Sequence, residues 1–547
     1  MTGNIVGNWR IGLVAAVLLL LVGCGGGEDG LTRVQQGNLD GVLHFGNGIE
    51  PEGLDPHIVT GNAENKIVSA LFEGLVGKNP ETLEVEPGVA ETWEISEDGT
   101  LYTFHIRDDA RWSNGDPVTA VDFHWSWNRI LEPELGAQYN YNLFPIANAE
   151  EYANGTIDDF SQVGVTVVDD HTLQVQLKTP TPFFLQLLDH YSTFPVHRPT
   201  IEAHGAMTDR LSPWARAGNL VGNGPFNLTE WQINSHVRVE KNDTYWDADA
   251  IDLNAIVFYP TENLVTEDRM FRDGQLHRTA EIVLDRIPVY RAERPEIVHI
   301  EPWLGTYFYM FNTTEPPFDD VRVRKALAMA IDRDLLDESV MQGIVEPAYA
   351  LVPPGTLGYQ PPKTFEQSAD RARELLAEAG YPNGEGFPEF EILYNTQESH
   401  RRMAVAIQQM WASELNIMVT LVNQEWKVYL ENQDNFNYDI SRRGWIGDYV
   451  DPNTFLDMYI TDGGNNKTGF SDPRYDEIIL REAPATLDRD ARYELYREAE
   501  TILMEAMPIL PVYTYTTKHL IDPSVKGMPT NIMDHVNYKY IWLDPDA

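Results

Sequence analysis

Residues 101–107 read Leu-Tyr-Thr-Phe-His-Ile-Arg, and their apolar and polar side chains alternate with a period of two. This alternation predicts a β-strand with one buried face, because successive side chains of a strand point to opposite sides of its sheet. Residues 171–177 (HTLQVQL) repeat the pattern. It therefore predicts a second strand with one buried face.

Three other stretches have helical patterns. Residues 320–331 (DVRVRKALAMAI) and 368–379 (SADRARELLAEA) read as amphipathic helices, and residues 488–507 read as a further long helix. Gly380 and Pro508 follow two of these stretches and predict their ends. Strands and helices mixed over 547 residues predict an α/β protein with two or three packed domains.

The charge of the chain limits the partners it can have. Its 84 acidic residues outnumber its 40 basic residues and give a formal net charge of −44. Nucleic-acid binding needs a basic face, so we expect no nucleic-acid partner. A solvated acidic surface, which screening by salt would stabilise, explains the composition.

The amino terminus resembles a bacterial lipoprotein signal. Residues 11–22 (IGLVAAVLLLLV) are too few for a comfortable membrane span, which needs about 20 residues. The chain's one cysteine, Cys24, follows directly, as in the lipobox, and one cysteine gives no disulfide framework in a monomer. The resemblance implies a signal peptide over residues 1–23, lipidation of Cys24 and a flexible tether over residues 24–40. A signal peptide with an incidental cysteine and an uncleaved anchor are the alternatives.

Motifs of catalysis are absent from the sequence. There is no GxSxG, HExxH, GxxxxGK[ST] or CxxC pattern, and the 14 histidines are scattered. We therefore expect no enzyme, no metal site and no cofactor. A Ser-His-Asp set assembled by the fold, as in an envelope peptidase, is the alternative that spacing leaves open.

Several short segments resemble the peptide/nickel-type extracellular solute-binding family of ABC importers, in the family's order. They are LDPH (54–57), LFEGL (71–75), PGVAETW (87–93), WSNGDPVTA (112–120), NGPF (223–226), PFDDVRVRKAL (317–327) and NQEW (423–426). The resemblance implies an α/β, two-lobed periplasmic solute-binding fold with a hinge and a ligand cleft. It places the hinge near Glu301 and Pro511.

The same resemblance divides the chain. It implies that lobe one comprises residues 41–72, 196–300 and 512–547, and that lobe two comprises residues 301–511. Residues 73–195 then form an extra subdomain of lobe one. Closure of the two lobes over a bound ligand is the expected motion.

Ligand contacts are also implied by the resemblance. The segment RRGWIGDY (442–449) is similar to the motif whose aspartate pairs with the α-amine of a peptide, and this role falls on Asp448. The other implied contacts are backbone groups of Gly444 and Ile446, aromatic pockets at Trp445 and Trp426, a ligand-pairing strand at Gly61 and Asn62, a carboxylate site at Arg442 and His400, and aromatic cleft residues Tyr139 and Tyr515. Without the resemblance, Asp448 fits a loop acid, and both tyrosines fit simple packing.

Three positions depart from the family pattern. Glu315 stands where the relative has a lysine, Gln433 where it has an arginine, and Thr60 where it has a glutamate. The loss of two cations disfavours a ligand carboxylate near those points. This leaves the peptide length open and favours a modified or basic peptide.

The resemblance implies a monomeric receptor that captures oligopeptides outside the membrane. It would deliver them to an ABC permease and its ATPase while a lipid anchor holds it to the membrane. The alternatives are a murein peptide, a metal chelate or an oligosaccharide as ligand, and a sensory rather than a transport role.

Overall fold

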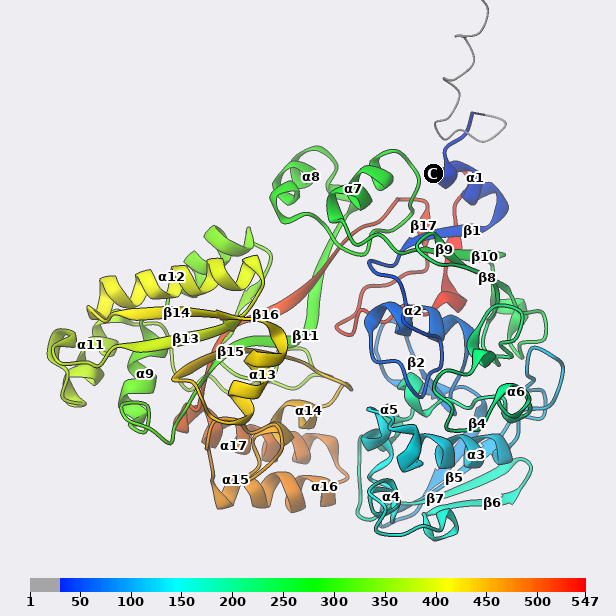
Figure 1. Cartoon of the computed structure of the whole chain (residues 1–547), viewed down its shortest axis with the longest axis horizontal. Helices are drawn as coiled ribbons and strands as arrows, with labels where there is room; N and C mark the ends of the chain where they lie inside the picture. Colours follow the sequence, from blue (N-terminus) through cyan, green and yellow to red (C-terminus); the bar gives the residue numbers. More distant parts are fainter. Residues whose placement is uncertain (1–29) are drawn as a thin grey trace, which may run out of the picture.

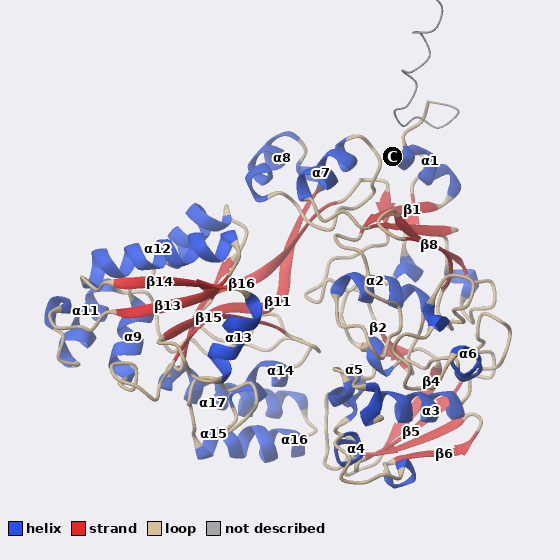
Figure 2. Cartoon of the chain, viewed as in Figure 1, coloured by secondary structure: helices blue, strands red, loops and turns tan. Residues whose placement is uncertain are grey.

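The computed structural model describes residues 30–547, so the predicted signal peptide and Cys24 lie outside the described residues. The molecule has two bodies of mixed strands and helices, joined by the long strands β11 (Val298–Phe311) and β16 (Ile509–Leu520) (Figure 1). Figure 2 shows the strands of each body flanked by helices. The predicted two-lobed α/β fold is confirmed.

Lobe one is built on a four-stranded sheet of order β1-β10-β9-β8. In this sheet β1 and β10 are parallel and the other pairs are antiparallel. Its strands are β1 (Val42–Gly46), β8 (Phe226–Gln232), β9 (His236–Lys241) and β10 (Ala255–Tyr259). Its helices are α1 (Arg33–Asp40), α2 (Asn62–Leu71), α6 (Arg198–His204), α7 (Leu264–Arg272) and α8 (Ile287–Glu293), and β17 (Val525–Lys526) pairs with β18 (Trp542–Leu543) near the carboxyl terminus.

Helix α1 corrects the predicted tether. The prediction of a flexible segment over residues 24–40 is wrong from Arg33 onward, where the chain is helical. Thr32 accepts a hydrogen bond from the Gln35 amide, and the Gln35 side chain accepts one from the Thr32 amide, which forms a capping box. The Val34 side chain is buried. Local capping and this apolar contact order a stretch whose polar composition resembles a linker.

The extra subdomain contains a second antiparallel sheet, of order β4-β5-β7-β6. The strands predicted over residues 101–107 and 171–177 are confirmed as β5 (Leu101–Ile106) and β7 (Thr172–Gln176). Trp112 and Trp127 are buried in its core. The other elements are β2 (Val76–Lys78), β3 (Val85–Pro87), β4 (Ala90–Ile95), β6 (Val165–Asp169), α3 (Ala120–Leu131), α4 (Ala149–Ala153) and α5 (Phe184–Leu187).

Lobe two surrounds a six-stranded sheet of order β12-β16-β11-β15-β13-β14. The three predicted helices are confirmed as α9 (Val321–Met329), α11 (Ala369–Glu378) and α17 (Arg489–Ala506). The remaining strands are β12 (Glu346–Pro347), β13 (Phe390–Asn395), β14 (Val419–Gln424) and β15 (Ile440–Ile446). The remaining helices are α10 (Arg333–Leu336), α12 (Glu398–Leu415), α13 (Trp426–Asp434), α14 (Asn453–Leu456), α15 (Pro473–Glu477) and α16 (Ala483–Ala485).

The ladder between β11 and β16 has a break. Its first part pairs Val298 with Leu520 and continues to Pro302 and Thr516. The register then shifts, and pairing resumes where Thr306 faces Thr514. The Leu304 amide, inside the break, donates to the Ile532 carbonyl at 2.6 Å. The break follows directly after Glu301, the residue beside which the hinge is expected.

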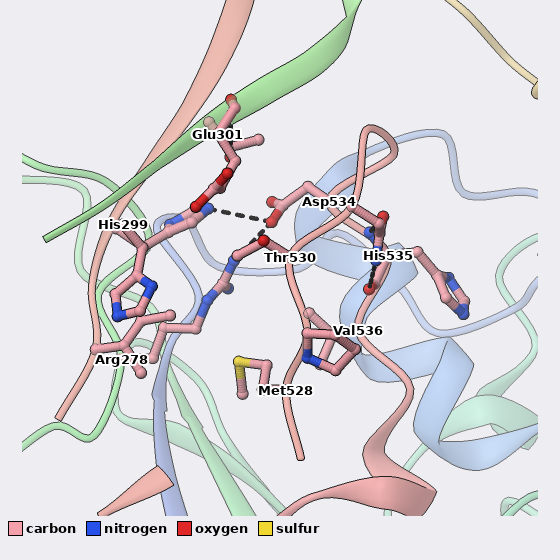
Figure 3. A pocket seen from close by; sticks show the side chains of 13 residues that line it. Arg278, His299, Glu301, Met528, Thr530, Asp534, His535 and Val536 are labelled. Carbon is pink, nitrogen blue, oxygen red and sulfur yellow. Dashed lines mark hydrogen bonds and ion pairs between the residues drawn. The ribbon is translucent and has the colours of Figure 1, made fainter. Parts of the chain in front are cut away.

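The two-stranded ribbon formed by β11 and β16 contacts a buried ion pair of lobe one. Arg278 donates to Asp534 at 2.8 Å, and the His519 ring nitrogen of β16 lies 3.1 Å from the same carboxylate oxygen (Figure 3). The Arg278 backbone also bridges Phe45 of β1 and Ile521, the residue after β16. His519 and Ile521 thus tie the end of β16 to lobe one, and the register break lies between this end and lobe two.

Removal of the Asp534 carboxylate should destabilise the protein strongly. The Arg278 side chain is 2% exposed, so Asp534→Ala leaves a buried cation without a partner and should lower the free energy of unfolding by about 3–5 kcal/mol in urea titrations. The matched control is Glu150→Ala, because the Lys178–Glu150 pair is solvent-exposed and should contribute less than about 1 kcal/mol. Equal losses of unfolding free energy for the two substitutions would contradict a stabilising role of the Arg278–Asp534 pair.

The Arg278–Asp534 pair also predicts that the stability of the protein depends on pH. Burial opposes ionisation of Asp534, but Arg278 and His519 together hold the pKa of its carboxyl well below the usual range. Its contribution to stability is therefore present above about pH 4, the pKa of an unfolded aspartate, and is lost as the pH falls through the lowered folded-state pKa. Unfolding measured between pH 7 and pH 2 should show a shallower acid limb for Asp534→Asn than for the unmodified chain.

Candidate functional site

Asp448 lies two residues after β15, where lobe two faces lobe one. Its amide donates to the Thr454 hydroxyl at 3.1 Å, which fixes the loop. Its carboxylate accepts a hydrogen bond from Tyr141 of the extra subdomain at 3.2 Å. The next residue, Tyr449, stacks on Phe183 of the subdomain with ring centroids 4.9 Å apart. The segment around Asp448 is thus a point of contact between the two lobes.

The charge of Asp448 is not neutralised by the protein. Among the side chains that the structure describes, no lysine, arginine or histidine pairs with the Asp448 carboxylate. Burial raises the pKa of Asp448 to about 6, against the hydrogen bond from Tyr141. Burial and the nearby charges of Asp448 and Asp451 raise the pKa of Asp457 to about 7. A half-buried carboxylate without a cation is costly, and an ammonium group of a ligand would lower that cost.

Arg442, on β15, provides a positive charge. It donates to the Tyr515 hydroxyl at 2.8 Å, and its guanidinium carbon lies 4.7 Å from the centroid of the Tyr307 ring. Its Nε atom is buried and has no hydrogen-bond partner. Among the described residues no carboxylate pairs with Arg442. The arrangement can accept an anion.

His400 contacts this cation without adding to its charge. The His400 side chain is buried, its ring lies 5.6 Å from that of Tyr307, and its Nδ1 atom has no hydrogen-bond partner. Burial and the charge of Arg442 lower the pKa of His400 to about 3. His400 is therefore neutral near pH 7 and can offer a hydrogen bond to an anion held by Arg442.

Strand β15 connects the two charges and has an open edge. Its pairing with β13 covers Ile440 and Ser441 only, whereas its pairing with β11 continues to Ile446. From Arg442 onward, one edge of β15 therefore has no neighbouring strand. Such an edge offers backbone donors and acceptors to an extended peptide. At about 3.3 Å per residue, the six steps along the chain from Arg442 to Asp448 span at most about 20 Å.

Gly444 is needed in the middle of this strand. A Cβ atom on Gly444 would lie 2.3 Å from the Tyr515 hydroxyl, the group that accepts from Arg442. Gly444 and Ile446 lie in the part of β15 that does not pair with β13, and their role as backbone contacts of a peptide stays a prediction. The buried Nε1 atom of Trp445 has no hydrogen-bond partner.

The remaining predicted residues fall in separate places. Tyr139 packs against His190 with ring centroids 4.6 Å apart and lies beside Tyr141, so it belongs to the Asp448 end, whereas Tyr515 belongs to the Arg442 end. The prediction of a strand at Gly61 and Asn62 is wrong, because Gly61 is the N-cap residue of α2 and Asn62 is its first residue. No hydrogen bond between described residues joins them to lobe two. Trp426 begins α13, and its side chain lies outside the described part of the structure.

The three departures from the family pattern have different surroundings. Gln433 is buried and donates to the Arg442 carbonyl at 3.1 Å, so it holds the backbone of β15 in place. Glu315 and Thr60 are exposed. Tyr141 and Asp457 were missed by the sequence reasoning. Their positions beside Asp448 come from the fold, and no motif or spacing signals them.

Comparison with known proteins identifies the family. The model of bacterial extracellular solute-binding proteins, family 5, matches residues 84–467. The chain belongs to this family. It is 36% identical over 490 residues to the periplasmic oligopeptide-binding protein OppA of Escherichia coli (strain K12), covering 88% of each chain. It is 38% identical over 498 residues to the periplasmic murein peptide-binding protein MppA of the same organism, covering 89% of this chain and 90% of MppA.

Solved structures agree with this assignment. The unliganded open form of the periplasmic murein tripeptide-binding protein MppA matches with a TM-score of 0.81 and 36% identity, over 92% of this chain and 97% of that one. The chain is thus a substrate-binding protein of the peptide ABC importer family, a family of solute-binding proteins. In residues 30–547, none of the helices combines the length and the apolar character needed to cross a membrane.

Proposed function

We propose that this protein captures oligopeptides with a free α-amine outside the membrane and delivers them to an ABC permease and its ATPase. The observation that carries the proposal is the half-buried carboxylate of Asp448, which faces lobe one and has no cation partner among the described residues. Arg442, at the other end of the open edge of β15, is a matching cation for the peptide carboxylate. The two charges together favour a zwitterion over a sugar.

The binding mode follows from the strand between these charges. The peptide lies along the open edge of β15 and pairs with backbone groups of Gly444 and Ile446. Its amine bonds to Asp448, and its carboxylate reaches Arg442 and His400. Backbone and terminal groups are common to all peptides, so these contacts support binding of many sequences. Lobe one closes over the peptide by rotation at the register break between Pro302 and Thr306.

We further propose that a lipid on Cys24 ties the receptor to the membrane. Support comes from the apolar run that ends just before the only cysteine of the chain, and from relatives that are periplasmic. Metabolic labelling with a radioactive fatty acid should mark the unmodified chain and leave Cys24→Ser unlabelled.

A murein peptide is a second candidate ligand. The 38% identity to a murein peptide-binding protein, and the TM-score of 0.81 to a structure of one, favour it as much as the oligopeptide relatives favour a general peptide. Competition calorimetry between a murein tripeptide and tri-alanine decides between them. A preference of more than about a hundredfold for the murein tripeptide would make it the ligand.

Asp448→Ala should weaken peptide binding at least about tenfold, because truncation of one partner of a desolvated charge pair costs about 2–5 kcal/mol. Calorimetry with di- to pentapeptides, after removal of co-purified ligand by unfolding and refolding, measures the loss. N-acetylated copies should bind the unmodified protein as weakly as free peptides bind the variant. Asp490→Ala is the control, since this acid is 93% exposed. Binding that is indifferent to acetylation would point to a non-peptide ligand.

Peptide affinity should also depend on pH. Because the pKa of Asp448 is raised to about 6, the carboxylate is charged at pH 7.5 and protonated at pH 5. A bound amine favours the charged form, so binding below pH 6 must release a proton and the Kd should rise toward tenfold per pH unit. Calorimetry between pH 7.5 and pH 4.5 measures the slope. Asp448→Asn should bind weakly with a flat profile, whereas a flat profile for the unmodified chain would contradict the assignment.

A further inference from the structure

The extra subdomain and lobe two each insert one side chain into the hydrophobic core of the other part. Leu83 of the subdomain is 4% exposed and belongs to the core that is built mainly from lobe two and the β11–β16 ribbon. Tyr449 of lobe two is 6% exposed and belongs to the core of lobe one and its subdomain. Among the described residues, no other residue of 73–195 lies in the first core and no other residue of 301–511 lies in the second. The insertions are therefore specific contacts between the two parts.

The turn between β2 and β3 holds Leu83 in a conformation that leucine seldom adopts. Its φ of +59° lies in the left-handed region. The Asn79 side chain accepts hydrogen bonds from two amides of the turn at 3.0 Å each, and the Leu83 amide donates to the Asn79 carbonyl at 2.9 Å. On its outer side Leu83 lines a cavity together with Leu357 and Val450 of lobe two. Backbone strain of this kind persists only where the surrounding structure fixes it, and it is typical of functional elements.

The same turn is fixed to lobe one beside the hinge. Lys78, the last residue of β2, forms a buried ion pair with Asp189. Asn531 donates to the Pro80 carbonyl at 3.1 Å. The next residue, Ile532, accepts the hydrogen bond that comes from within the register break of the ribbon. Leu83 therefore enters lobe two directly beside the hinge.

Two further contacts join the subdomain to lobe two. Tyr449 stacks on Phe183, as described above. Leu487, between α16 and α17, lies against the turn at Gly99, where an added Cβ atom would meet the Leu487 Cδ2 atom at 2.8 Å and the Pro180 Cβ atom at 3.5 Å. In Figure 1, α16 lies beside the subdomain, at the end of lobe two away from α12. The subdomain thus contacts lobe two from the hinge to this far end.

These contacts lie on the Asp448 side of the cleft, because Tyr449 directly follows Asp448. The Arg442 side chain, in contrast, bonds to Asn395 and to Tyr515 of the ribbon, and to no described residue of the subdomain. The chain superposes on the unliganded open form of MppA with a TM-score of 0.81 and on the peptide complex of Haemophilus influenzae OppA with 0.75. The contacts are therefore present in an arrangement closer to that open form than to that complex.

We propose that the extra subdomain keeps lobe two docked at the Asp448 end of the cleft with and without ligand, so that the cleft opens and closes at the Arg442 end. Separation of the docked parts would expose Leu83 and Tyr449 to water, whereas rotation about the line of contacts keeps both buried. Asp448 then keeps its place beside Tyr141 before a ligand arrives, which lowers the ordering cost of binding. The docking itself does not depend on which solute binds.

Distances between spin labels, measured by pulsed electron paramagnetic resonance, test this docking. The labels are placed on pairs of introduced cysteines in the Cys24→Ser chain, which has no other cysteine. One pair joins exposed Asp158 of the subdomain to exposed Asp490 of α17, and the second joins exposed Ser235 of lobe one to exposed Gln409 of α12. The first distance should be narrowly distributed without ligand and unchanged at saturating tri-alanine. The second distance should shorten, because α12 also carries His400 at the Arg442 end.

Three substitutions remove the docking contacts: Leu83→Gly, Phe183→Ala and Leu487→Ala. Glycine suits the left-handed φ at position 83, so the turn keeps its shape while the inserted side chain is lost. In the triple variant the first distance should broaden toward longer values, and the Kd for tri-alanine should rise about tenfold. Leu487→Ala alone alters a side chain that is 49% exposed, so the variant should fold and broaden the first distance in the same direction.

Leu335→Ala is the matched control, because Leu335 of α10 is also 49% exposed, and it should change neither the first distance nor the Kd. A first distance that shortens as much as the second when ligand is added, or that the three substitutions leave unchanged, would overturn the docking. If tri-alanine binds neither protein, the proposed function fails, and the ligand-free comparison of the unmodified chain with the triple variant decides about the docking by itself.

Discussion

The pairing of β11 with β16 is the interaction on which the rest of the structure depends. These strands belong to the central sheet of lobe two at one end and to the joint with lobe one at the other. His519 of β16 contacts the Arg278–Asp534 ion pair of lobe one, and the register break after Pro302 lies between this contact and lobe two. Leu304 lies within this break and accepts a hydrogen bond from Gly447 at 2.7 Å. The loop that carries Asp448 is thus attached to the hinge itself.

The cleft has charges that the folded protein does not neutralise. Asp448 and Arg442 are both held on or next to β15, each away from a partner of opposite sign, and the elevated pKa of Asp448 expresses the cost. Perturbed acids of this kind cluster at functional sites, where stability is traded for a poised group. Under the proposed function, a zwitterionic peptide would supply both missing charges at once, so part of the energy lost on folding would return on binding. The Arg278–Asp534 pair beside the hinge has the opposite arrangement, because Asp534 already has a cation partner within the protein.

Elements with a strong local pattern could be predicted from the sequence. Strand β5 alternates with period two, and α17 ends before Pro508, so each follows from its own residues. Helix α1 was missed because its capping box is local but its composition is that of a linker. The role of Asp448 came from a family resemblance, since the residues alone fit a loop acid. Tyr141 and the Lys78–Asp189 pair could not be predicted, because only the fold brings such distant segments together.

Under the proposed function, recognition in this site would rest on groups that all peptides share. The open edge of β15 and the charges of Arg442 and Asp448 match a peptide backbone and its two termini. A ligand can shift the lobes only by as much as it prefers the closed state. Asp448 already bonds to Tyr141 across the cleft, so an amine bound at Asp448 would add to an existing contact between the lobes. Closure would then be favoured at the amine end of the peptide, where the two lobes already meet.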